Sequence, residues 1–354
     1  AAPPRIIARD GDFDTDKQGE RQIGAYRWID SDHLLIQIVS RDNYAGEWFD
    51  NIRYASFNRA TGKIIPLGWT DSLGATSVLW TSSSGPARVL LQRVNVRSST
   101  EMWGSPEVLE IDADTGKTRV AMRSNNEVSS WDVDEGGVVR MGVSRDAETG
   151  KVQVLYRPDE ASALKKVYDG IPDRYSGAAL PEMMMAGTGK AYSTSRKDGF
   201  SALYEYDLAT MQLGKKVFGV DGYDISGASI SPDRTKIDSV NVVTKRDTRI
   251  FFDPRLKEIQ SVLEESFGPG NAYIATADAK REKIVLRASA MGQPESWYLF
   301  DTVTGGMGRI AYANDTLKNA MLNPVSVVRY PASDGKSIEA VLTMPRHRAG
   351  QKNL

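Results

Sequence analysis

Short apolar stretches with polar residues at alternate positions recur along the whole chain. The longer ones are rich in Val, Ile, Leu and Thr and lie at 34–40, 88–96, 138–144, 191–195, 237–244 and 283–288. A shorter apolar stretch precedes each of them, at 26–30, 77–82, 128–133, 182–187, 226–231 and 273–277. Alternation with a period of two is typical of half-buried β-strands. The pattern therefore predicts an all-β protein whose repeated units each begin with two neighbouring strands.

A further strand in each unit runs into a polar turn. In the clearest copies the turn contains Thr-Gly, as in Asp112-Ala113-Asp114-Thr115-Gly116. The landmark residues of the copies are Asn58, Asp112, Arg157, Asp207, Asp253 and Asp301, which lie about 48 residues apart. A period of this length, with about four short antiparallel strands per unit, is typical of β-propeller blades. We expect blades at about 24–69, 76–123, 128–170, 180–220, 225–266 and 272–313.

Two stretches depart from this repeat. Between residues 254 and 266 the apolar side chains follow helical spacing, with Pro254 at the first turn, which predicts a short helix in or in place of an outer strand. Residues 1–10 contain the stretch Pro4 to Ala8, which is typical of the last strand of a blade. Six units and this remnant indicate a seven-bladed parent propeller whose first blade is incomplete. Unpaired strand edges would follow, so we expect self-association, an opened ring or strands supplied by another chain.

Charge and composition narrow the range of partners. The 354-residue chain has 45 Lys and Arg against 46 Asp and Glu, and this balance argues against nucleic-acid or anionic-membrane binding. The sequence contains no cysteine, so disulfides, zinc–thiolate sites, iron–sulfur clusters and cysteine nucleophiles are excluded. It has no apolar run of about 18 residues, so no transmembrane helix is expected. These features fit a soluble protein in either the periplasm or the cytoplasm.

The segment from Val327 to Pro345 carries the most specific resemblance to a known family. It contains an Asp334-Gly335 turn and then an apolar strand that ends in Thr343-Met344-Pro345. Together with the blades, it resembles the N-terminal propeller of the prolyl oligopeptidase family of serine peptidases, in its acylaminoacyl-peptidase and dipeptidyl-peptidase-like branch. In that family a similar segment leads from the propeller into an α/β-hydrolase domain. The resemblance implies a propeller over 1–323, and over 324–354 a linker and the first strand of a hydrolase domain that would follow Leu354.

This resemblance implies that the parent protein is a serine peptidase that hydrolyses short peptides, with the propeller controlling access of substrate. The family nucleophile lies on a Gly-x-Ser-x-Gly turn, which this sequence lacks, so no catalytic residue is assigned to the chain. The expected partners are a peptide and the hydrolase domain, and no cofactor is expected. An alternative is a stand-alone binding propeller of the Tol-system or WD-repeat type. A third reading, an enzyme with its site in the central channel, requires clustered acids or histidines on the innermost strands.

Few residues offer other chemistry. His33 lies in a polar turn, and we interpret it as structural because no serine turn is available to pair with it. His347 lies in a basic linker and is expected to be exposed. Asp12, Asp14 and Asp16 imitate the start of a calcium loop, but the positions that require Gly and Glu carry other residues. No metal site is therefore expected.

The connections between the second and third strands are the best candidates for binding substrate. In the first two units they are expected to be long loops, at 42–49 and 98–104, that combine Trp with an acid. Exposed Trp beside a carboxylate is typical of a ligand anchor or an interface. The candidate substrate-binding residues are Glu47, Trp48, Glu101 and Trp103. The alternative is that both tryptophans pack against neighbouring blades, because large aromatic side chains are mostly buried.

Overall fold

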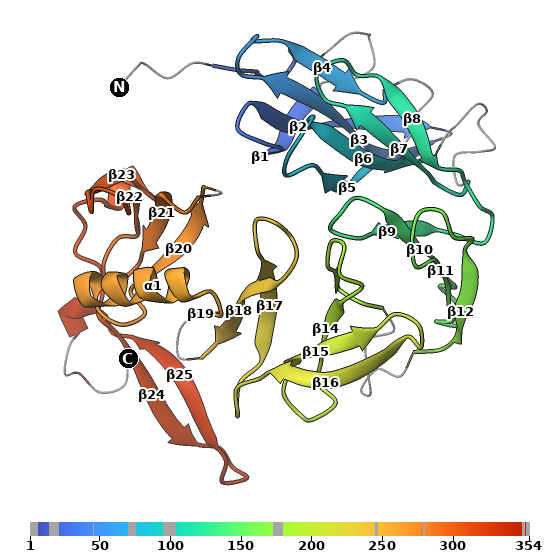
Figure 1. The fold of residues 1–354 in the computed structure, drawn as a ribbon. Helices are drawn as coiled ribbons and strands as arrows, with labels where there is room; N and C mark the ends of the chain where they lie inside the picture. Colours follow the sequence, from blue (N-terminus) through green and yellow to red (C-terminus); the bar gives the residue numbers. More distant parts are fainter. Residues whose placement is uncertain are drawn as a thin grey trace. The chain divides into compact units, whose positions relative to one another are not determined.

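The computed structural model describes residues 6–13, 21–44, 46–69, 76–94, 104–172, 180–244, 247–278, 280–348 and 351. Antiparallel strands dominate these residues, and each blade-type sheet is built from strands that pair with their neighbours in the sequence (Figure 1). The predicted all-β fold with β-propeller blades is confirmed.

Four sheets precede residue 220. The first contains β1 (Arg21–Trp28), β2 (His33–Tyr44), β3 (Glu47–Asn58) and β4 (Ile64–Leu67). The second contains β5 (Ser77–Thr81), β6 (Arg88–Arg93), β7 (Glu107–Asp112) and β8 (Thr118–Met122). The third contains β9 (Ser130–Val133), β10 (Val139–Arg145), β11 (Val152–Tyr156) and β12 (Lys165–Gly170). The fourth contains β13 (Met183–Met184), β14 (Ala191–Ser195), β15 (Ala202–Asp207) and β16 (Gln212–Phe218).

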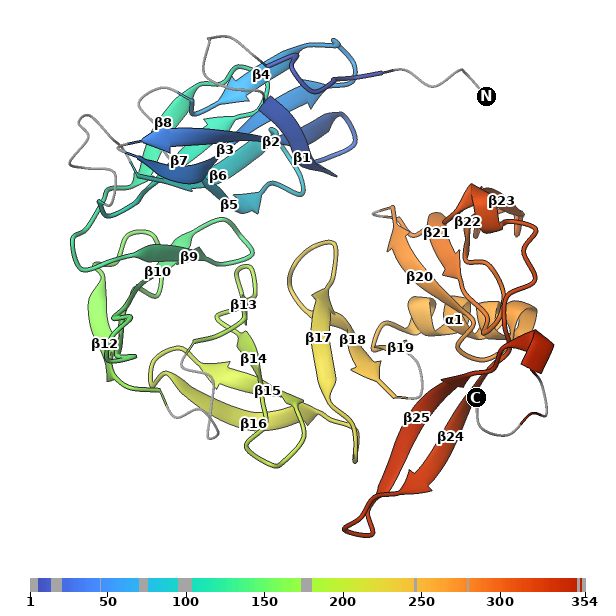
Figure 2. The same cartoon turned by 180° about the vertical axis from the view of Figure 1, so that it is seen from behind.

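The remaining sheets are less uniform. The fifth has three strands, β17 (Ile225–Ile230), β18 (Ile237–Val243) and β19 (Asp247–Phe251), and continues into helix α1 (Pro254–Phe267). The sixth contains β20 (Ala272–Ala277), β21 (Lys283–Ala288), β22 (Ser296–Asp301) and β23 (Met307–Tyr312). A short 3₁₀ turn, η2 (Asp315–Leu317), precedes a hairpin of β24 (Val325–Pro331) and β25 (Ser337–Thr343), which η3 (Arg346–Arg348) follows. Figure 2 shows these elements from behind.

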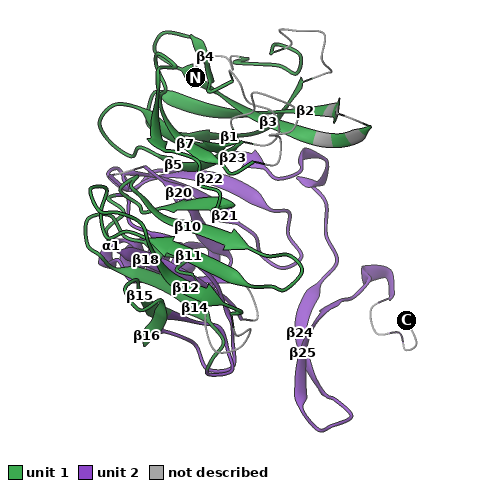
Figure 3. Cartoon of the chain, turned by 90° about the vertical axis from the view of Figure 1, so that its right-hand side faces the viewer, with its two compact units in different colours: residues 1–197, 204–217, 233–235 green, residues 198–203, 218–232, 236–354 purple. Residues whose placement is uncertain are grey.

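The chain divides into two compact units (Figure 3). The first comprises residues 1–197, 204–217 and 233–235, and the second comprises 198–203, 218–232 and 236–354. In the first unit, apolar side chains of successive sheets pack face to face. Leu35 and Leu67 of the first sheet meet Leu91 and Ile111 of the second in one such layer. Leu90 of the second sheet shares another layer with Trp131 of the third, so the second sheet is buried on both faces.

Helix α1 confirms the helix expected at 254–266 and takes the place of an outer strand. Asp253 caps its first turn, because its Oδ1 accepts hydrogen bonds from the backbone N–H groups of Arg255 (3.0 Å) and Leu256 (3.1 Å). Pro254 follows at a position that needs no backbone donor. The buried face carries Leu256, Ile259 and Leu263, which pack with Phe251 and with the sixth sheet in the core of the second unit.

The predicted blade remnant near the N-terminus is not a strand in the part that the structure describes. Residues 6–9 have no regular structure, and residues 1–5 lie outside the described ranges. The described residues include no neighbouring strand with which this stretch pairs. Ala8 and Phe13 instead pack on a cluster of Leu34, Ile36 and Phe57, whereas Ile6 and Ile7 are exposed.

Candidate functional site

The strands β2 and β3 form a long hairpin where a loop was predicted. Their register pairs His33 with Asn58 and continues without a break to Tyr44 and Glu47. The loop predicted at 42–49 is therefore wrong for the described residues, which continue the ladder almost to the turn. In the described residues, β1 pairs with β2 as far as Arg21 and Ser40, and the β2–β3 ladder continues beyond that pair.

Trp48 lies on this extension and is 62% exposed. The Arg41 guanidinium stacks over its ring, 6.0 Å from the ring centroid. Such a contact keeps an exposed aromatic side chain in place without burying it. The structure thus favours exposure of Trp48 over packing against a neighbouring blade. Glu47 belongs to the same strand, while Glu101 and Trp103 lie outside the described residues.

A second group of polar side chains surrounds Trp80 on the innermost strand of the second sheet. The indole Nε1 donates to the backbone oxygen of Glu135 at 2.9 Å. The guanidinium groups of Arg88 and Arg234 lie 5.9 and 5.5 Å from the centroid of the Trp80 ring. Gly137 has a φ of +83°, and a Cβ there would lie 3.0 Å from that ring, so only glycine fits.

Glu135 is the acid of this group. Burial raises its pKa, the charge of Arg234 opposes that effect, and the charge of Asp134 adds to it. Its Oε2 lies 3.7 Å from Nη1 of Arg234. The backbone N–H of Glu135 donates to Met184 of the fourth sheet, so the group also braces neighbouring blades. This group around Trp80 was not predicted from the sequence. The acidic turn Asp134-Glu135-Gly136-Gly137, which directly follows an innermost strand, was the available signal.

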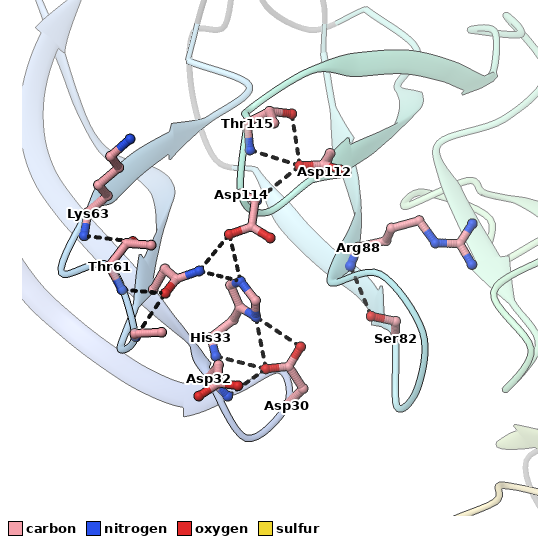
Figure 4. A network of polar contacts seen from close by, with 12 residues as sticks. Asp30, Asp32, His33, Thr61, Lys63, Ser82, Arg88, Asp112, Asp114 and Thr115 are labelled. Atoms are coloured by element: carbon pink, nitrogen blue, oxygen red, sulfur yellow. Dashed lines mark hydrogen bonds and ion pairs between the residues drawn. The ribbon is translucent and has the colours of Figure 1, made fainter.

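His33 lies between two carboxylates (Figure 4). Its Nδ1 lies 2.9 Å from Asp30, and its Nε2 lies 2.9 Å from Oδ1 of Asp114 in the next sheet. Burial lowers the pKa of His33, but the hydrogen bonds to Asp114 and Asp30 outweigh it, so the pKa is raised overall. An imidazole that holds its proton between two acids is a poor general base. His33 therefore joins two blades, in line with a structural role.

Of the other polar residues considered as candidates, those that the structure describes do not join these groups. His347 is exposed in η3, as expected. Asp12 accepts a hydrogen bond from the backbone of Arg9, while Asp14 and Asp16 lie outside the described ranges. Among the described residues, no three His, Asp or Glu side chains are grouped so that they could hold a metal ion. In the same residues no helix is long and apolar enough to cross a membrane.

Comparison with known proteins supports the interpretation of the blades. No family model matches the chain. The chain is 23% identical over 243 residues to dipeptidyl aminopeptidase BIII of Pseudoxanthomonas mexicana. The predicted resemblance to the prolyl oligopeptidase family is confirmed. The match covers 68% of this chain but only 34% of the relative, so the chain spans about a third of the length of that relative.

Two solved structures similar to this chain are those of peptidases. One is a puromycin-hydrolyzing peptidase of Mycobacterium tuberculosis, with 13% identity, a TM-score of 0.49, and coverage of 89% of this chain and 57% of the other. Another is prolyl oligopeptidase B of Galerina marginata, with 12% identity, a TM-score of 0.48, and coverage of 91% and 46%. In each case the chain corresponds to only part of the larger protein.

Proposed function

We propose that this chain is the substrate-gating propeller of a serine peptidase that hydrolyses short peptides. The observation that carries the proposal is the hairpin of β24 and β25, which follows the sixth blade. Tyr330, Val341 and Leu342 of this hairpin are 49%, 66% and 41% exposed. Tyr330 and Leu342 lie on one face of the hairpin and Val341 on the other, and exposed apolar side chains of this kind commonly mark a place where another domain or partner packs. A hydrolase domain joined here would cover them.

In this proposal, catalysis and peptide binding belong to different domains. The hydrolase domain would supply the serine nucleophile, its base and its oxyanion hole, and cleavage would proceed through an acyl ester. The propeller would admit short peptides and hold their ends. The similarity to a dipeptidyl aminopeptidase supports a peptide substrate. We assign Trp48 as an aromatic anchor for the peptide, with Glu47, Glu101 and Trp103 as further contacts.

The test compares the 354-residue chain with the product of its complete reading frame. An active-serine probe is expected to label the complete product and not the 354-residue chain, which lacks the serine turn. The complete product should cleave dipeptidyl-nitroanilides and should reject folded proteins. A complete product that the probe does not label would contradict the proposal and favour a binding propeller.

The anchor assignment is tested in the same assay. Trp48→Ala should raise KM for a dipeptidyl substrate by about tenfold with little change in kcat, because an exposed anchor contributes to binding. Phe200→Ala is the matched control, since Phe200 is also exposed, at 49%, but lies at a turn outside the hairpin. An unchanged KM for Trp48→Ala would remove Trp48 from the site.

A further inference from the structure

A cavity of about 250 Å³ lies between the fifth and sixth sheets, within the second unit. Its lining comes from four strands, β17, β18, β19 and β20, and comprises Ser226, Asn241, Val242, Thr248, Arg249 and Tyr273. Hydroxyl groups, one amide and one guanidinium thus surround it. The cavity is too small for a folded partner and suits a small polar group of a larger ligand.

Among the described residues that line the cavity, only Arg249 carries a formal charge, on its guanidinium. Its Nε donates to Oδ1 of Asn241 at 2.9 Å, and its Nη1 donates to the backbone oxygen of Ile274 at 2.9 Å. Both acceptors are neutral. Burial lowers the pKa of Arg249, an effect that the neighbouring Tyr273 opposes, yet a guanidinium stays protonated at neutral pH.

Arg249 differs from its neighbours in the second unit because no carboxylate of the described residues forms an ion pair with it. Arg281 is paired with Asp238 and Asp253, and Arg287 is paired with Glu295. Arg249 is half-buried, and a guanidinium that is partly removed from water without a carboxylate partner favours an anion beside it. The cavity beside Arg249 therefore has the electrostatic character of an anion site.

The sheet is built in a way that leaves this space open. Gly227, Asn241 and Arg249 lie in one row across β17, β18 and β19. A β-bulge between Ile225 and Gly227 displaces Ser226, which lines the cavity. Gly227 has no side chain, and a Cβ at this position would meet no atom within 4 Å, so the space beside this part of β17 is open.

We propose that this cavity binds a carboxylate of a peptide. A planar guanidinium matches a planar carboxylate, and hydroxyl and amide donors can complete its coordination. The carboxylate comes either from the C-terminus of the peptide or from an acidic side chain. The choice of a peptide as its carrier rests on the proposed peptidase function. The site itself rests on the chain alone, so it can be tested without any catalytic activity.

The experiment is a calorimetric titration of the 354-residue chain at low salt with three capped alanine peptides. The first has a free C-terminus, the second has an amidated C-terminus and one Glu, and the third is amidated and neutral. Saturable binding of the first or the second identifies the source of the carboxylate. Equal binding of the neutral peptide, or no binding of any peptide, would overturn the proposal.

Two variants connect the binding to Arg249. Arg249→Gln should weaken binding by at least about tenfold, because the charge-assisted bonds are lost. Asn241→Asp should weaken peptide binding by a similar factor while Arg249 stays in place. The new carboxylate at 241 would pair with the Arg249 guanidinium and compete with the carboxylate of the peptide. Arg309→Gln and Asn314→Asp are the controls, because both residues are exposed in the same unit and neither lines the cavity. If either test variant folds and binds as the wild type does, Arg249 is not the anion ligand.

Discussion

At the scale of single residues, one substitution within the repeat explains how two blades are joined. Four copies of the polar turn begin with Asp, but the first begins with Asn58. The Oδ1 of Asn58 accepts from the backbone of Ala60 and Thr61, as the aspartates do in their own turns. Its Nδ2 donates to Asp114 at 2.6 Å. An aspartate at 58 would instead oppose Asp114, so the amide allows the contact that His33 completes.

The His33 contact predicts a pH dependence of stability. The pKa of His33 is raised in the folded state, so its contribution is complete below about pH 6.5 and is lost as the pH rises through the folded pKa. Asp114→Asn removes the negative charge beside protonated His33 and should therefore lower the free energy of unfolding at pH 6. Because Asp114 is half exposed, we expect a decrease of only about 1 kcal/mol. The variant should also flatten the decline between pH 6 and 9.

The measurement is urea unfolding at a series of pH values. Asp334→Asn is the control, because Asp334 caps an exposed turn by accepting from the backbone of Lys336 and does not contact His33. A wild-type stability that stays constant from pH 6 to 9 would show that the His33 contact does not favour the protonated form.

At the scale of elements, the same aspartate position produces two different structures. Asp112, Asp146, Asp207 and Asp301 each accept from the backbone N–H groups two and three residues later and close a turn. Asp253 accepts in the same way but begins helix α1. The residues that follow decide between the two: Thr-Gly reverses the chain, whereas Pro254 and the apolar spacing behind it continue into a helix.

One turn has methionine where the others have glycine. Gly62, Gly116, Gly150 and Gly305 have φ between 70° and 73°, and Met211 takes φ 54° at the same point. The side chain of Met211 is only 6% exposed and packs in the core shared by the third and fourth sheets. Burial of this side chain therefore offsets the unfavourable backbone conformation, which costs about 1 kcal/mol.

Two variants at equivalent turn positions separate the effect of side-chain burial from that of the backbone conformation. Met211→Gly should destabilise the protein by about 1–3 kcal/mol, because the loss of a buried methionine outweighs the relief of strain. Gly305→Ala should cost about 1 kcal/mol from the backbone alone, since a Cβ there meets no atom within 4 Å. Thermal unfolding measures both changes. A more stable Met211→Gly protein would show that strain dominates at this turn.

The sequence predicted elements more reliably than sites. Strand alternation, the spacing of the turns and Pro254 were enough to predict β-propeller blades and helix α1, because these signals are local. The strand predicted near the N-terminus is not found in residues 6–9, where Ala8 packs on a sheet face and Ile6 and Ile7 are exposed. Arg249 and Glu135 could not be found, because their neighbours come from strands that lie far apart in sequence. The ladder at 42–49 was predicted to be a loop because Trp and Glu are compatible with both a loop and an exposed ladder.

At the scale of the whole molecule, the β24–β25 hairpin of the 354-residue chain has exposed apolar side chains. A two-stranded sheet is marginally stable alone, and its outer edges can pair with other strands. We therefore expect concentration-dependent self-association of this chain, driven by the exposed apolar side chains of the hairpin. Val341→Lys should reduce it, whereas Val303→Lys, at a turn where Val303 is 71% exposed, should not. Light scattering during size-exclusion chromatography measures the mass, and a monomer at every concentration would contradict the prediction.

The extended ladder of β2 and β3 has a consequence for how such propellers diversify. Side chains alternate faces along a strand, and each residue adds about 3.4 Å to its length. Inserting two residues in each strand would move Trp48 outward by about 7 Å and keep it on the same face, whereas inserting one would turn it to the opposite face. Reach can therefore be adjusted in paired increments to suit ligands of different length, while the blade beneath is left untouched.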